Sequence, residues 1–265
     1  MKVQTLTGPE FKTCCATLYQ DKLLQFLLGP SLHPGGLALT RQLAERINLS
    51  SDDKVLDVGS GPGETAKFLA SEYGCRVYGV ELSTRLARRA LEASKKDAEF
   101  VAADAEHLPL KTNYFNAVLS ECSLCLFPDF RTGLEEIQRV LLPGGRLGVT
   151  DIVTNGPLPT EPESVLASLL CLAQKMSGSE YASEAEEAGF TEVQALDQTG
   201  SMRSMLQGIR KRLFLAEILS GIGKLSLPTE QSRDGKRLLA LAAEAVEGGK
   251  LSYLMMTASK PKAQN

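Results

Sequence analysis

The chain has 265 residues, of which 43% are hydrophobic and 23% charged, and its formal net charge is −3. This length allows a sizeable buried core in one large domain or two small ones. The sequence pI of about 5.6 gives no basic footprint for nucleic acid, and no apolar run approaches the roughly 20 residues of a membrane span. The first residues, MKVQTLTGPEFKTCC, contain no apolar signal region, and we therefore expect a cytoplasmic protein with reduced cysteines.

Residues 1–48 are predicted to form an N-terminal helical lid. Apolar residues recur at helical spacing over about Phe11–Leu28 and Leu37–Ile47. A connector rich in Gly and Pro joins these two segments and contains His33. We expect His33 to hold the turn through a hydrogen bond rather than to act in catalysis.

Residues 49–200 alternate short apolar runs with amphipathic stretches, a pattern typical of strands joined by helices. The predicted strands are Lys54–Val58, Arg76–Val80, Phe100–Ala103, Tyr114–Ser120, Arg146–Val153 and Glu192–Leu196. The predicted helices are Glu64–Tyr73, Ser83–Lys96, Thr132–Leu142, Glu163–Met176 and a segment ending at Glu184–Gly189. Because parallel strands need long crossover connections, this order predicts an α/β fold with helices on both sides of a parallel sheet.

Residues 201–265 are predicted to belong to the same domain. Two long amphipathic helices, near Met202–Leu219 and Glu230–Glu247, are followed by a last strand at Leu251–Ala258.

A glycine-rich turn, Gly59-Ser60-Gly61-Pro62-Gly63, follows the first predicted strand and precedes a helix. Such a turn lets a ligand approach the backbone and the helix N-terminus, although it can also be purely structural. Glu81 ends the second strand, where an acid can bind ribose hydroxyls, and Asp104 ends the third, within reach of an adenine edge. The carboxyl ends of these strands lie on one rim of the sheet, which predicts a ligand site there.

These segments resemble the class I S-adenosylmethionine-dependent methyltransferases over about residues 40–200. The motifs that carry the resemblance are VLDVGSGPG (55–63), GVELS (79–83), AADAEHLPL (102–110), FNAVLS (115–120) and VLLPGGRLGVTDI (140–152). The resemblance implies a Rossmann-like, doubly wound, mostly parallel seven-stranded sheet with an antiparallel last strand, and a helical insertion before that strand. A dinucleotide fingerprint fits less well, because the glycines form GxGxG rather than GxGxxG.

The resemblance also implies an enzyme with S-adenosyl-L-methionine as cofactor. In that family the glycine loop contacts the methionine part, the acid at Glu81 holds the ribose, and Asp104 with Ala105 flanks the adenine. The expected cofactor residues are Asp57, Gly59, Ser60, Gly61, Gly63, Glu81, Leu82, Asp104, Ala105 and Ser120.

Five of the six cysteines are expected near the mouth of this site. Cys122 and Cys125 follow the fourth strand, Cys171 follows the fifth, Cys14 and Cys15 lie in the N-terminal segment, and Cys75 is expected in the core. A single cysteine is usually a small buried hydrophobe, but a group of five at one rim favours a role in binding.

A narrower resemblance is to the arsenite methyltransferases. SECSLC (120–125) is similar to that family's Ser-Asn-Cys-Val, and LLCLAQKMSGSEY to its Glu-Cys-Leu-Gly-Gly-Ala, although Glu121 replaces Asn and the Gly-Gly is absent. The resemblance implies that Cys122 and Cys171, with Cys14 or Cys15, are catalytic and bind trivalent arsenic as substrate, not as a structural metal. An external reducing thiol such as glutathione would regenerate the reduced state.

Two alternatives remain open. The first is a C- or O-methyltransferase of an organic molecule such as a quinone precursor, with an apolar pocket formed by Met202, Met205, Phe214, Leu215 and Leu219. The second is a cofactor-binding module without catalysis, against which the intact glycines and acids argue.

Overall fold

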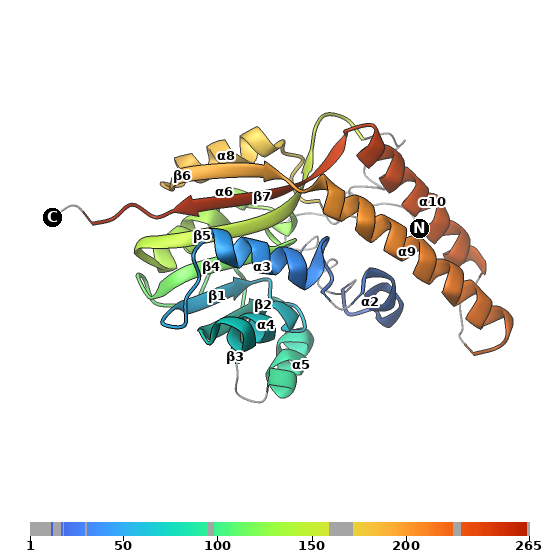
Figure 1. Ribbon diagram of the computed structural model, residues 1–265, viewed down its shortest axis with the longest axis horizontal. Coiled ribbons are helices and arrows are strands. Elements are labelled where there is room, and N and C mark those ends of the chain that lie inside the picture. The colour runs from blue at the N-terminus through green and yellow to red at the C-terminus, as the bar shows by residue number, and fades with distance from the viewer. Residues whose placement is uncertain are drawn as a thin grey trace.

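One twisted sheet with helices on both faces forms the body of the protein, and a helical hairpin projects from one side of it (Figure 1). The computed structural model describes residues 12, 17, 19–29, 31–94, 98–158, 172–224 and 229–263. Within these residues seven strands pair in the order β3-β2-β1-β4-β5-β7-β6. The predicted α/β fold, with its antiparallel last strand, is confirmed.

The strands lie close to their predicted positions. They are β1 (Lys54–Val58), β2 (Arg76–Glu81), β3 (Ala98–Ala102), β4 (Phe115–Glu121), β5 (Leu141–Thr154), β6 (Thr191–Asp197) and β7 (Leu251–Ser259). The first five strands pair in parallel, whereas β7 runs antiparallel to both β5 and β6.

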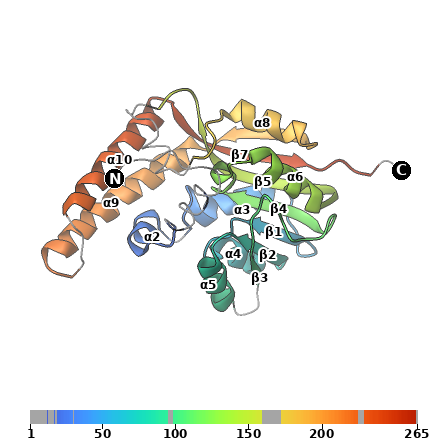
Figure 2. The ribbon, with the colours of Figure 1, turned by 180° about the vertical axis from the view of Figure 1, so that it is seen from behind.

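The helices fill the connections between these strands. They are α2 (Lys22–Leu28), α3 (Gly36–Arg46), α4 (Glu64–Tyr73), α5 (Thr84–Ser94), the short 3₁₀ helix η1 (Leu124–Leu126), α6 (Phe130–Val140), α8 (Gly178–Glu187), α9 (Thr199–Gly221) and α10 (Thr229–Glu247). The pair α9–α10 is the projecting hairpin and lies between β6 and β7 in the sequence, as predicted (Figure 2).

The sheet is buried on both faces, which explains why its strands read as unbroken apolar runs. Val55 and Leu56 are neighbours on β1 and are both fully buried, but they belong to different cores. Val55 packs in the core that includes residues of α3, α4 and α10, and Leu56 packs in the core that includes α6 and α8. This arrangement leaves the carboxyl ends of the parallel strands as the open rim of the sheet.

Two predictions about helices are corrected, and parts of the predicted helices at 11–28 and 163–176 lie outside the described residues. Helix α2 begins at Lys22, where the Asp21 side chain accepts a hydrogen bond from Leu24 N and caps it. Leu172–Met176 is not helical: Ala173 N donates to Cys125 O, and Thr154 N donates to Met176 O. Helix α6 ends at Val140, two residues earlier than predicted, and the Pro-Gly-Gly that follows lies within β5.

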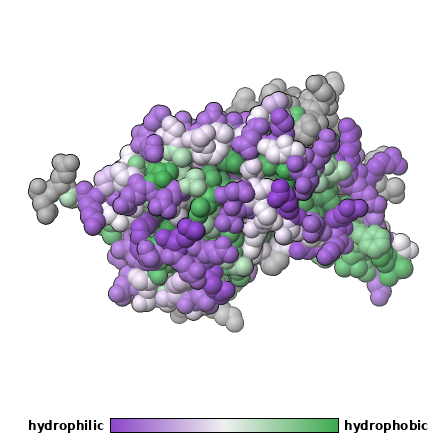
Figure 3. Space-filling model, turned by 45° about the horizontal axis from the view of Figure 1, so that its top comes forward, coloured by the Kyte–Doolittle hydropathy of each residue, from purple (hydrophilic) through white to green (hydrophobic). Residues whose placement is uncertain are grey.

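The projecting hairpin carries an exposed apolar group. Phe214, Leu215 and Ile218 of α9, and Ile222 directly after it, are all exposed, and Figure 3 shows hydrophobic side chains gathered at the hairpin end of the molecule. Among the described residues no helix is both long and apolar enough to cross a membrane.

Candidate functional site

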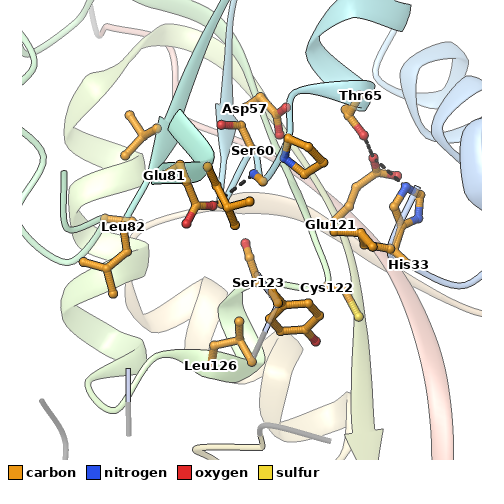
Figure 4. Close-up of a pocket in the computed structure, with 18 of the residues that line it drawn as sticks. His33, Asp57, Ser60, Thr65, Glu81, Leu82, Glu121, Cys122, Ser123 and Leu126 are labelled. Atoms are coloured by element: carbon orange, nitrogen blue, oxygen red, sulfur yellow. Dashed lines mark hydrogen bonds and ion pairs between the residues drawn. The ribbon is translucent and has the colours of Figure 1, made fainter. Parts of the chain in front are cut away.

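A cavity opens at the carboxyl ends of β1, β2 and β4, on the predicted rim (Figure 4). Eight of the ten predicted cofactor residues line it: Asp57, Gly59, Ser60, Gly61, Glu81, Leu82, Asp104 and Ala105. Gly63 and Ser120 do not line it. Gly63 is the N-cap of α4, and the Ser120 hydroxyl lies 2.6 Å from that of Ser123.

The glycine loop comes close to the chain that follows β4. Gly59 has φ 74°, and a Cβ placed on it would lie 2.4 Å from Ser123 Cβ. Ser123 is held in place because its hydroxyl donates to Val58 O at 2.8 Å. The loop therefore requires glycine at position 59 both for its backbone conformation and for this contact.

Glu81 is a buried carboxylate with its two oxygens fixed by backbone amides. Gly61 N donates to one oxygen at 3.0 Å and Ser83 N to the other at 2.8 Å. Burial raises the pKa of Glu81, and these two hydrogen bonds oppose the rise. Each oxygen keeps a further lone pair, so the carboxylate can accept hydrogen bonds from a ligand such as a diol.

The opposite end of the cavity contains a second buried carboxylate, Glu121. Its oxygens accept hydrogen bonds from Thr65 Oγ1 at 2.7 Å and from Thr40 Oγ1 at 3.0 and 3.1 Å. His33 Nε2 lies 3.5 Å from it, while His33 Nδ1 lies 3.2 Å from Pro34 O. His33 thus holds its turn as predicted, and it also lines the cavity.

Among the described residues, Asp57 Oδ2, Ser60 Oγ and His33 Nε2 are buried without a hydrogen bond within the protein, although His33 Nε2 lies 3.5 Å from Glu121. Burial, with the charges of Glu121 and Glu81, raises the pKa of Asp57 well above its usual value. Buried polar atoms are normally paired, and the three residues that carry these atoms all line the cavity. Such a region fits a ligand end that carries a positive charge and hydrogen-bond donors.

The raised pKa of Asp57 predicts a pH-dependent cost to stability. The folded state binds this proton more tightly than the unfolded state, so stability falls as pH rises through the interval between the two pKa values and stays lower above it. Asp57→Asn cannot ionise and should melt about 2–4 °C above wild type at pH 8, with the difference vanishing in acid. Thermal unfolding of both proteins at pH 4 and pH 8 tests this, and a difference that did not change with pH would contradict it.

Cys122 directly follows β4, before η1, and lines the cavity. Its backbone has φ 55°, unusual for a residue with a side chain, and its amide donates to Thr150 O at 2.7 Å. Leu32, on the opposite connector, also has φ 55° and also lines the cavity. Strained backbone of this kind is concentrated at functional sites.

Cys125, which was also expected near the mouth of the site, is buried and does not line the cavity. A hydrogen bond with Cys122, and then burial, raises the pKa of the Cys125 thiol well above its usual value. Asp151 fixes this turn, since one of its oxygens accepts from Cys125 N at 2.9 Å and from Tyr181 Oη at 2.7 Å. The spacing Cys-x-x-Cys was the available sequence signal for this pair.

The other predicted thiols are distributed differently. Cys14, Cys15 and Cys171 lie outside the described residues. Cys75 is core as expected, and burial raises its pKa to about 11. Within the described ranges no group of three or more His, Cys, Asp or Glu side chains is placed to hold a metal ion.

The apolar pocket proposed for an organic acceptor does not form from the predicted residues. Met202 is buried in the core beside the sheet, while Phe214 and Leu215 are exposed on the hairpin. None of the five predicted residues lines the cavity. Along α9, Met202 packs against the sheet, whereas Phe214 and Leu215 face solvent.

Comparisons with known proteins agree with this architecture. Residues 56–149 match the methyltransferase domain family. O-methyltransferase rstn1 of Aspergillus nomiae is 31% identical over 60% of this chain and 73% of the relative. Methyltransferase GfsG of Streptomyces halstedii is 34% identical over 55% of this chain, and an arsenite methyltransferase of Halobacterium salinarum is 32% identical over 55%.

The lengths of these relatives differ from that of this chain. The chain spans only 54% of GfsG and 39% of the arsenite methyltransferase. Among solved structures, phosphoethanolamine N-methyltransferase 2 of Haemonchus contortus superposes with a TM-score of 0.83 at 20% identity, over 97% of this chain and 61% of the other. That similarity concerns the fold.

Proposed function

This chain belongs to the class I S-adenosylmethionine-dependent methyltransferases, and we propose that the small molecule it methylates is trivalent arsenic held by cysteine thiols. The observation that carries the proposal is Cys122 on the wall of the cavity, with the buried Cys125 three residues later in the same turn.

S-adenosylmethionine, the cofactor of this family, supplies a methyl group on a positively charged sulfur. The residues present fit it along the length of the cavity. Glu81 offers two fixed carboxylate oxygens for the ribose hydroxyls, and Asp104 lies at the adenine end. Asp57 and Glu121 line the other end of the cavity, where acidic side chains can accept hydrogen bonds from the ammonium of the amino-acid part.

The thiols suit arsenic because trivalent arsenic is a soft acceptor of sulfur ligands. Condensation of arsenous acid with two thiols forms two arsenic–sulfur bonds and releases two waters, so neutral buried thiols are adequate reactants. The arsenic keeps its lone pair, and no side chain has to remove a proton from it. The protein's contribution is then positioning, which can supply much of the rate enhancement of a displacement.

A reducing thiol such as glutathione belongs to this proposal. Cys122 and Cys125 are free thiols three residues apart, and oxidation of either would remove an arsenic ligand. The relative named an arsenite methyltransferase supports arsenic as acceptor over the part of the chain that it matches.

A second candidate acceptor is the hydroxyl of an organic molecule. A hydroxyl must lose its proton during methylation, and His33 with Glu121 is a buried acid–base pair on the cavity wall. The relative named O-methyltransferase rstn1 supports this candidate. Glu121→Gln should then depress turnover of a phenol while leaving arsenic binding intact.

Binding of phenylarsine oxide, which condenses with two neighbouring thiols, tests the arsenic proposal. We expect one equivalent to bind per native chain with loss of two free thiols, measured by intact mass and thiol titration. Cys122→Ser should abolish this binding, whereas Cys75→Ser, a buried thiol away from the cavity, should not change it. Full binding by Cys122→Ser would contradict the proposal.

A further inference from the structure

Helix α9 has one face toward the protein and one face toward solvent. On the inner face, Leu213 and Ala216 are buried, and Leu23 and Leu27 of α2 pack against them. Figures 1 and 2 show α9 projecting from the body of the protein, with α10 along one side of it. The inner face of α9 therefore has its partners within the chain.

The outer face of α9 carries four large apolar side chains, which we call the outer patch: Phe214, Leu215, Ile218 and Ile222. Their exposed fractions are 64%, 46%, 48% and 61%. They recur at spacings of three and four residues, which places them on one side of the helix. Single exposed apolar residues are normal on protein surfaces, but a group of them bordered by polar residues marks a surface that binds a partner. Figure 3 shows this group beside hydrophilic side chains.

Basic side chains flank the outer patch. Arg210 and Lys211 are exposed on the turn of α9 before it, and Lys224 is exposed shortly after it. None of these three forms an ion pair with another described residue, whereas the carboxylate of Glu217 is neutralised by Lys236 at 2.6 Å. Residues 210–237 contain seven Lys and Arg but only three Asp and Glu, in a chain whose net charge is −3. The hairpin is thus locally positive.

The combination of apolar and basic groups favours one occupant of this surface. A second copy related by a two-fold axis would place the same surface against itself, and Arg210 and Lys211 would then approach their own counterparts. A nucleic acid would pair with the basic side chains through its phosphates but would leave the apolar ones without an apolar partner. A bilayer with anionic lipids offers phosphate and carboxylate groups to the cations and acyl chains to the apolar side chains.

We propose that the outer patch of α9 docks this protein on the surface of a phospholipid bilayer with anionic headgroups. The helix lies in the plane of the interface, its four apolar side chains insert at the boundary of headgroups and acyl chains, and Arg210 and Lys211 contact the headgroups. This inference goes beyond methyl transfer and does not depend on which acceptor the enzyme methylates.

Co-sedimentation of the full chain with vesicles tests the apolar part of this surface. We expect wild type to bind vesicles of equimolar phosphatidylcholine and phosphatidylserine more tightly than vesicles of phosphatidylcholine alone. Leu215→Ser should weaken binding to the anionic vesicles about tenfold, because an apolar side chain no longer leaves water. Leu91→Ser, the same change at a leucine of α5 that is 53% exposed, should bind as wild type does.

The same assay tests the electrostatic part. Lys211→Gln should weaken binding to the anionic vesicles about fivefold, since one cation near the surface is lost. Lys111→Gln, the same change at an exposed lysine between β3 and β4, is the matched control and should have no effect. Added salt should release wild type from the vesicles, because it screens these attractions.

Tryptophan fluorescence gives a second readout, since the chain contains no tryptophan. Emission of Phe214→Trp should shift to shorter wavelength when anionic vesicles are added, whereas that of Leu91→Trp should not. Absence of vesicle binding by wild type, or equal binding by wild type and Leu215→Ser, would overturn the proposal. A dimer in solution that Leu215→Ser dissociates, without vesicle binding, would also overturn it and would assign the patch to a second copy.

Discussion

Glu81→Gln is expected to weaken S-adenosylmethionine binding by about 100-fold, because hydrogen bonds to a charged acceptor are each worth about 1.5–3 kcal/mol. The amide keeps the volume of the side chain but replaces one acceptor oxygen with a donor. In the variant this NH2 group faces the backbone N–H of Gly61 or of Ser83, from which the wild-type Glu81 carboxylate accepts a hydrogen bond. The ribose hydroxyls therefore lose a charged acceptor and the glycine loop loses a fixed contact. Calorimetric titration measures the affinity.

The pH dependence separates this effect from a general loss of structure. Since burial raises the pKa of Glu81, wild-type affinity should fall in mildly acidic solution as the carboxylate is protonated, whereas Glu81→Gln should lack this component. Glu99→Gln, the same change at an exposed position on the neighbouring strand β3, is the matched control. An affinity of Glu81→Gln within twofold of wild type would show that the ribose is bound elsewhere.

Cys122→Ser is expected to lower the rate of arsenic methylation by at least about 100-fold, because a hydroxyl is a hard ligand that binds soft arsenic poorly. Serine has nearly the same shape and can keep the amide contact to Thr150 O. Cofactor affinity should therefore remain close to that of wild type, so the loss should appear in turnover alone. Methylated arsenic, quantified by mass spectrometry with a reducing thiol present, measures the effect.

Cys75→Ser is the control for Cys122→Ser, since it removes a thiol that donates to Leu69 O within the core. The melting temperature of Cys75→Ser must be measured as well, because a serine buried in an apolar core lowers stability. Equal turnover by wild type and Cys122→Ser would show that Cys122 takes no part in the reaction.

The central part of the fold was predictable from sequence because its strands are buried on both faces and its turns are marked by glycine and proline. The bounds of β1 and α4 match the prediction at both ends. The glycine loop, Glu81 and Asp104 could be placed on one rim because parallel strands bring their carboxyl ends together.

The parts that could not be predicted depend on contacts between distant residues. Leu172–Met176 has a helical pattern, but hydrogen bonds to Cys125 O and from Thr154 N hold it in another conformation. Thr40 and Thr65 lie on separate helices, and no local pattern indicates that both meet Glu121. The contact of Lys12 with Asp104 is likewise long-range. By contrast, the presence of Cys122 and Cys125 in one turn follows from their spacing of three residues.

The most direct test of the proposed acceptor is formation of methylated arsenic by the wild-type enzyme. Arsenite, S-adenosylmethionine and glutathione are supplied, and methylated arsenic and S-adenosylhomocysteine are quantified together. We predict that the two products form in equal amounts and that neither accumulates when arsenite is omitted. Cofactor binding with no methylated arsenic, accompanied by methylation of a phenolic acceptor, would contradict arsenic as the substrate and favour the His33–Glu121 pair as the reacting group.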